Sequence, residues 1–282
     1  MSDHNFYKEV DHSVYQFVDD SSSSLGFNNK KIMENYLQLY LKIMENFYNI
    51  NKLKLNPSKT KYLINCNKSA RNEVRDFKLT LDNEILYPDG NVRILGVLFS
   101  SDNTYTVYCN DLIAQINYRF VNLMKVKSLT DQETRLRFCN AFLLGKINYA
   151  LMLFYNGRKD DLQKLHTMYM KIARNCHKAY PFKVTNSKVL APLKWLSLPD
   201  LIKVRVLNFT HSIIVNKKPE AIYSNLIIPT RSSKNIRFVN NFKINNIFPN
   251  FIKLYNELPG EFRLMNRKGF KLKIKKQVLN LR

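Results

Sequence analysis

The spacing of the apolar residues changes along the chain, and this change limits the folds that the chain can adopt. Before residue 100, apolar and polar positions alternate in short runs, as at Phe77, Leu79 and Leu81, which is typical of strands. After Thr106, apolar residues recur every three or four positions, which is typical of helices that bury one face. We therefore expect an α/β or α+β fold for the first 100 residues, where the strands lie, and helices after them.

Turn signals at Asp19-Asp20 and Asp82-Asn83 and one long helical pattern organise these first 100 residues. The apolar run Ser13–Val18 meets Asp19-Asp20 and a run of serines, which predicts a strand, a tight turn and a second strand. From about Asn28 to Ile50, polar and apolar stripes alternate with helical period, so this helix should pack on a sheet. A further strand is predicted at Val92–Phe99.

Helices are expected in the remainder of the chain. Seven Gly and nine Pro in 282 residues favour long helices over a turn-dense all-β fold. A capping box at Thr130–Glu133 predicts a helix that begins at Thr130, runs towards Tyr155 and ends at Asn156-Gly157. Two more helices are predicted, one around Leu201–Ile214 and a basic one from about Arg267.

The helix predicted after Gly157 has two unlike sides. Apolar residues such as Leu165, Tyr169 and Ile172 recur every three or four positions and should pack inward. On the opposite side we expect a basic stripe that binds nucleic acid, formed by Lys164, Lys171, Arg174 and Lys178.

The charge is strongly basic and unevenly distributed. The chain has 45 Lys and Arg against 22 Asp and Glu, a formal charge of +23. Residues 1–50 contain four basic and seven acidic residues, so the other residues carry 41 against 15, a net charge of +26. A field of this size attracts polyanions, so we expect nucleic-acid binding by the part of the chain after residue 50.

The N-terminus and the cysteines narrow the class of protein. The sequence MSDHNFYKEV lacks the apolar core of a signal peptide, and no run of apolar residues is long enough to span a membrane. The four cysteines, at positions 66, 109, 139 and 176, lack the spacing of a zinc site. We therefore expect a soluble, intracellular protein with reduced thiols and no membrane partner.

Three motifs in the first 100 residues resemble a known enzyme family. Y-Q-F-V-D-D (15–20), L-K-L-N-P-S-K-T (53–60) and I-L-G-V-L-F (94–99) resemble, in order and spacing, the later palm motifs of reverse transcriptases. The resemblance is closest to the enzymes of jockey-like non-LTR retrotransposons. It implies that residues 1–100 are the end of a palm domain, with a catalytic hairpin, a nucleotide-binding lysine turn and a hairpin like the primer grip.

The resemblance continues to the C-terminal part of the chain. L-T-D-Q-E-T-R-L (129–136), P-L-K-W-L-S-L-P (192–199) and N-E-L-P-G-E-F-R (256–263), followed by G-F-K-L-K-I, look like landmarks of the same elements. By this resemblance residues 101–180 are thumb-like helices, and residues 181–282 are a basic C-terminal region.

The resemblance assigns roles to four residues. Asp19 and Asp20 match the carboxylate pair that binds catalytic Mg²⁺ or Mn²⁺, the acidic site that two-metal phosphoryl transfer needs. Lys59 matches the lysine near the phosphates of the incoming nucleotide, where a cation helps pyrophosphate to leave. Gly96 matches the primer grip, where the missing side chain lets the nucleic-acid backbone approach.

The sequence also departs from the family. Only eighteen residues precede Asp19, and none of them resembles the earlier palm strand with its further catalytic Asp, or the fingers. We therefore expect a C-terminal fragment of an RNA-directed DNA polymerase that is inactive alone. By the resemblance, it acts in the nucleus, and its partners are an RNA template, a DNA primer and the rest of the polymerase. The alternative is a non-catalytic basic helical module that binds RNA or DNA.

Overall fold

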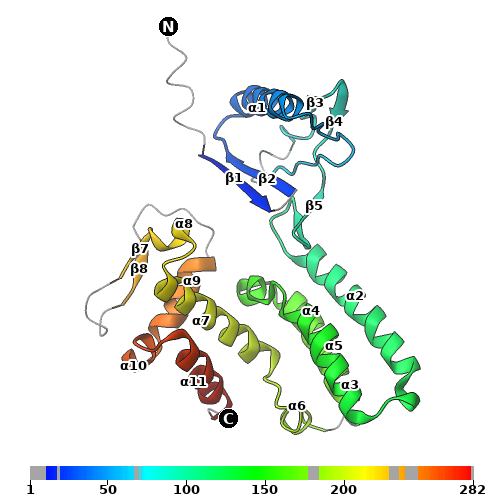
Figure 1. The fold of residues 1–282 in the computed structure, drawn as a ribbon, viewed down its shortest axis with the longest axis vertical. Helices are drawn as coiled ribbons and strands as arrows, with labels where there is room; N and C mark the ends of the chain where they lie inside the picture. Colours follow the sequence, from blue (N-terminus) through cyan, green and yellow to red (C-terminus); the bar gives the residue numbers. More distant parts are fainter. Residues whose placement is uncertain are drawn as a thin grey trace. The chain divides into compact units, whose positions relative to one another are not determined.

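The computed structural model describes residues 11–17, 20–66, 70, 72–176, 184–228, 235–238 and 247–280. The chain forms two compact units, Met1–Tyr108 and Cys109–Arg282, and each is described by itself. The fold mixes helices with short antiparallel sheets, as expected for the α+β class (Figure 1). The second unit contains residues 109–180 of the helical part predicted at 101–180 together with the whole part predicted at 181–282.

The described residues of the first unit form three two-stranded antiparallel sheets. They are β1 (Asp11–Phe17) with β2 (Asp20–Gly26), β3 (Leu79–Leu81) with β4 (Glu84–Leu86), and β5 (Asn91–Ile94) with β6 (Val97–Ser100). The single strand predicted at Val92–Phe99 is wrong, because Leu95 and Gly96 reverse the chain there. Both residues have positive φ, 47° and 82°, as a two-residue hairpin turn requires.

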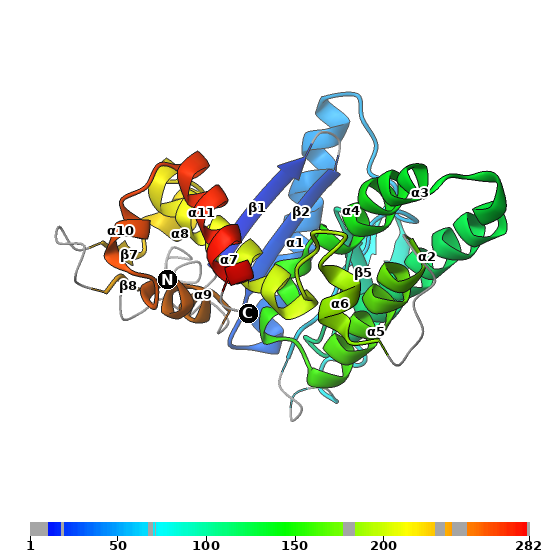
Figure 2. The same cartoon turned by 90° about the horizontal axis from the view of Figure 1, so that it is seen from below.

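Helix α1 (Lys30–Ile50) confirms the helix predicted from about Asn28. Asn29 caps it, because its side-chain oxygen accepts hydrogen bonds from the backbone N–H groups of Lys31 and Ile32. The helix runs beside the β1–β2 hairpin (Figure 2). The hydroxyl of Tyr40 lies 2.6 Å from that of Ser23 in β2, so a side-chain hydrogen bond joins the two elements.

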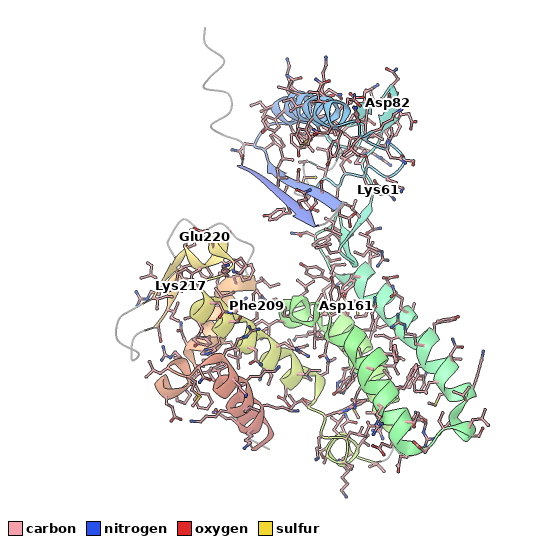
Figure 3. The ribbon with its side chains drawn as sticks, viewed as in Figure 1. Lys61, Asp82, Asp161, Phe209, Lys217 and Glu220 are labelled. Carbon is pink, nitrogen blue, oxygen red and sulfur yellow. The ribbon has the colours of Figure 1, made fainter. Side chains whose placement is uncertain are left out.

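The second unit begins with a group of helices around α5 (Lys159–Cys176). Its other elements are α2 (Thr106–Lys125), the 3₁₀ turn η3 (Lys127–Leu129), α3 (Gln132–Phe138), the π-helical η4 (Cys139–Leu144), α4 (Gly145–Asn148), the 3₁₀ turn η5 (Leu151–Asn156) and α6 (Asn186–Leu190). Asp161, at the start of α5, is buried, and its backbone carbonyl accepts a hydrogen bond from the thiol of Cys109 (Figure 3). Burial raises the pKa of that thiol to about 11, which keeps it protonated.

The helix predicted from Thr130 to Tyr155 is interrupted. Asp131, rather than Thr130, is the N-cap, because its carboxylate accepts a hydrogen bond from the backbone N–H of Thr134. The chain then continues through the wide turns of η4 into α4, and Ala150, with φ of 54°, separates α4 from η5. The predicted end at Asn156-Gly157 is confirmed.

The rest of the second unit packs around α7 (Leu198–Asn216). It comprises α8 (Glu220–Tyr223), the short strands β7 (Leu226–Ile227) and β8 (Arg237–Phe238), α9 (Ile247–Asn256), α10 (Gly260–Arg263) and α11 (Arg267–Asn280). Phe209 on α7 meets the rings of Phe248 and Phe251 on α9 (Figure 3). The helices predicted around Leu201 and from Arg267 are thus present, together with one two-stranded sheet that was not predicted.

Candidate catalytic hairpin and nucleic-acid interface

The β1–β2 hairpin carries the predicted carboxylates. Its strands pair in regular antiparallel register up to Phe17, which is opposite Asp20, so the predicted strand–turn–strand arrangement holds for the described residues. Asp20 begins β2 and is exposed. Asp19 and Val18 lie outside the described residues.

Asp20 is the carboxylate that the described residues place at the end of this hairpin. Mg²⁺ is usually held by one or two carboxylates together with substrate phosphates, and the exposed carboxylate of Asp20 fits that role. Within the described ranges, no cluster of three or more His, Cys, Asp or Glu side chains could hold a metal ion.

Lys59 lies on a turn that the side chain of Asn56 organises. The side-chain oxygen of Asn56 accepts hydrogen bonds from the backbone N–H and the hydroxyl of Ser58. The backbone carbonyl of Asn56 accepts another from the backbone N–H of Lys59. Lys59 is exposed to solvent on this turn.

The lysines on either side of Lys59 are engaged within the first unit. Lys54 pairs with Asp82 at 2.7 Å, and Lys61 lies 3.8 Å from Asp89 (Figure 3). Both pairs are solvent-accessible, so each contributes little to stability, but each reduces the charge available to a phosphate. Lys59 is therefore the best-placed cation of this segment for an external anion.

Gly96 is the second residue of the β5–β6 turn. Its φ of 82° is a conformation that side-chain-bearing residues rarely adopt, so the turn itself accounts for a glycine here. The carbonyl of Gly96 accepts a hydrogen bond from the guanidinium of Arg93 at 3.3 Å. The turn thus explains the glycine by itself, and the primer-grip role of Gly96 stays a prediction.

The residues of the basic stripe predicted on α5 differ in their exposure to solvent. Lys164 and Lys171 are exposed, and Lys171 also donates a hydrogen bond to Asn117 of α2. The prediction is wrong for Arg174, which is only 9% exposed and donates hydrogen bonds to the carbonyl of Val184 and the side chain of Asn186. Its guanidinium holds the start of α6 instead of facing solvent. Lys178 lies outside the described residues.

The basic terminal helix α11 adds a second cationic surface. The helix contains six Lys and Arg and no acidic residue. Phe270 and Ile274 are buried, whereas the opposite side is exposed and carries Lys268, Lys271, Lys275 and Lys276. Lys273 is different, because it pairs with Glu261 at 3.0 Å and lies over the ring of Phe262.

The predicted site residues therefore lie on separate elements. Asp20, Lys59 and Gly96 belong to three different turns or hairpins of the first unit, and Lys164 and Lys171 share α5 in the second.

Within the described parts of the chain, the helices lack the combination of length and apolar character that crossing a membrane requires. Comparisons of the chain with protein-family models, curated proteins and solved structures found no match.

Proposed function

We propose that this chain is the C-terminal part of the reverse transcriptase of a jockey-like non-LTR retrotransposon. It contributes the end of the palm, the thumb and the basic C-terminal region of an RNA-directed DNA polymerase. In this proposal it binds RNA template and DNA primer, acts in the nucleus, and depends on the remainder of the polymerase for nucleotide addition.

The observation that carries the proposal is the β1–β2 hairpin, with Phe17 paired to Asp20 and the carboxylate of Asp20 exposed. An acidic hairpin end followed by a helix is the local structure that the resemblance of Y-Q-F-V-D-D implies. The exposed turn lysine Lys59 and the tight turn at Gly96 then follow in the order of the palm motifs.

The chemistry divides between the two units. In the complete enzyme Asp19 and Asp20 would hold Mg²⁺, which would supply positive charge beside the reacting phosphates. Lys59 presents a mobile cation to the nucleotide phosphates. The exposed lysines of α5 and α11 bind the backbone of the template–primer duplex, without reading its sequence.

Salt-dependent binding tests the interface. We expect the affinity of the chain for an RNA–DNA hybrid to fall steeply between 50 and 200 mM salt, because bound lysines release counterions. The double variant K164E/K171E should bind more weakly and with a smaller salt slope. K30E/K42E makes the same change of charge on α1 and should bind like the unaltered chain. Affinity that does not depend on salt would contradict the interface.

The alternative function, a basic helical module that binds RNA or DNA without chemistry, is favoured by the excess charge of +26 after residue 50. It predicts the same salt dependence. Only the role of the carboxylates separates the two proposals, because a binding module has no use for Asp19 and Asp20.

A further inference from the structure

Two exposed aromatic side chains flank a glycine: Phe142 lies in η4, and Tyr149 is the first residue after α4. Phe142 is 53% exposed and Tyr149 is 47% exposed, and Gly145 lies between them on the exposed side. The opposite side is buried at Cys139, Leu143, Leu144 and Ile147. We call Phe142, Gly145 and Tyr149 the aromatic face.

The fold of the described chain does not require a glycine at position 145. Its φ and ψ, −55° and −44°, are those of an ordinary helical residue. A Cβ atom added there would meet only the carbonyl oxygen of Asn140, at an ordinary contact distance of 3.9 Å. Alanine stabilises a helix interior more than glycine does, so this glycine lowers stability without a local structural reason.

A missing side chain between two exposed rings lets another molecule approach the helix backbone closely. The preceding turn of π-helix, Cys139–Leu144, widens the backbone at the same place, and such turns are frequent at functional sites. The rings of Phe138 and Phe142 lie 4.8 Å apart with 37° between their planes, so Phe138 extends the apolar surface along the segment.

The charge around the aromatic face indicates which molecule could approach. The guanidinium of Arg119, on α2, donates a hydrogen bond to the carbonyl of Phe142 at 3.3 Å and is exposed. Arg137 is exposed one turn before Phe142, and Lys146 follows Gly145. Glu133 pairs with Arg137 at 2.6 Å. Exposed rings among cations are the combination that binds a single nucleic-acid strand, because bases stack on rings and phosphates pair with cations.

We propose that the aromatic face binds a single-stranded segment of RNA or DNA. Bases stack on Phe142 and Tyr149, the sugar–phosphate backbone passes over Gly145, and Arg119 and Lys146 neutralise its phosphates. This inference rests on the proposed function for the nature of the polyanion. It adds a second binding mode, which depends on stacking and uses side chains other than the lysines of α5.

Fluorescence anisotropy with a short single-stranded oligonucleotide tests the inference. We expect F142A and Y149A each to weaken binding about tenfold, in the range measured for removing one stacking ring. G145A should raise the melting temperature by about 2 °C yet weaken oligonucleotide binding, because its methyl group blocks the approach. Y87A, which removes another exposed ring, and G90A, which adds a methyl group in open space, are the matched controls.

An RNA–DNA hybrid measured in parallel separates this inference from the proposed function. If F142A, Y149A and G145A bind the single strand like the unaltered chain, the aromatic face is not a nucleic-acid site, even where hybrid binding persists. If G145A binds as well as the unaltered chain while the ring variants weaken, the close approach over Gly145 is wrong. Self-association lost in F142A/Y149A, with oligonucleotide binding intact, would assign the face to a second copy of the chain and overturn the proposal.

Discussion

His211 and Phe270 stack face to face in the second unit, with ring centroids 3.9 Å apart and 6° between the ring planes. The contact joins α7 to α11 inside the core. Nδ1 of His211 also lies 2.9 Å from the hydroxyl of Tyr255, so this buried histidine has both an apolar and a polar partner.

Acid should destabilise the second unit through His211. Burial lowers the pKa of His211 from its ordinary value of 6.5, and a backbone contact with Met265 only partly offsets this. The unfolded chain therefore takes up the proton first as the pH falls. The stabilisation is complete above about pH 6.5 and is lost as the pH drops through the pKa of the folded state.

Thermal unfolding between pH 8 and pH 5, followed by circular dichroism, checks this prediction. The variant H211Q can still bond to Tyr255 but does not titrate, so its melting temperature should fall less steeply with acid. The variant H166Q is measured in parallel, because burial also lowers the pKa of His166 and its contribution to the acid sensitivity must be told apart from that of His211. Parallel curves for H211Q and the unaltered chain would show that His211 is not responsible.

Ala150 has a left-handed backbone conformation, with φ of 54° and ψ of 16°. This conformation costs a residue with a side chain about 1 kcal/mol, and glycine adopts it freely. A150G should therefore raise the free energy of unfolding by about 1 kcal/mol. A114G makes the same chemical change at an exposed site inside α2 and should lower it by about 1 kcal/mol. Urea denaturation measures both, and a loss of stability in A150G would refute the assignment of strain.

Variants of Gly96 separate its turn role from its proposed primer-grip role. G96A should open the β5–β6 hairpin, with faster amide exchange at Val92–Phe99, because its φ of 82° strains an alanine by about 1 kcal/mol. G96N should keep the hairpin, because asparagine tolerates left-handed conformations. If nucleic acid approaches Gly96, G96N should still bind an RNA–DNA hybrid more weakly. Unchanged hybrid affinity in G96N would leave Gly96 with its turn role alone.

Periodicity predicted α1 well because apolar and polar stripes repeat along the interval from Asn28 to Ile50, although this helix contains no fully buried residue. The start predicted at Arg267 was close to that of α11. The turn predicted at Asp82-Asn83 is present, since both residues adopt the positive φ that a tight hairpin needs.

Residues whose position depends on a distant partner could not be predicted from spacing. Arg174 lies on the expected side of a helical wheel, yet its long side chain donates hydrogen bonds to Val184 and Asn186. These partners lie ten and twelve residues further along the chain, beyond the end of α5. Ala150 turns the chain although alanine does not favour positive φ, so this break had no sequence signal. The turn at Leu95-Gly96 was indicated by Gly96 and the resemblance, and not by the alternation of apolar residues. Phe47 lies on α1, the helix that was expected to pack on a sheet, yet its side chain is 57% exposed.

Primer extension on an RNA template tests the central claim most directly. The 282-residue chain should give no more product than its D19N/D20N variant, because two-metal chemistry needs a further carboxylate and a bound template. The same chain joined to the fingers and earlier palm of a jockey-like reverse transcriptase should extend the primer, and either D19N or D20N should reduce extension to background. Extension by the 282-residue chain alone above the double variant, or an extended enzyme indifferent to both substitutions, would contradict the account.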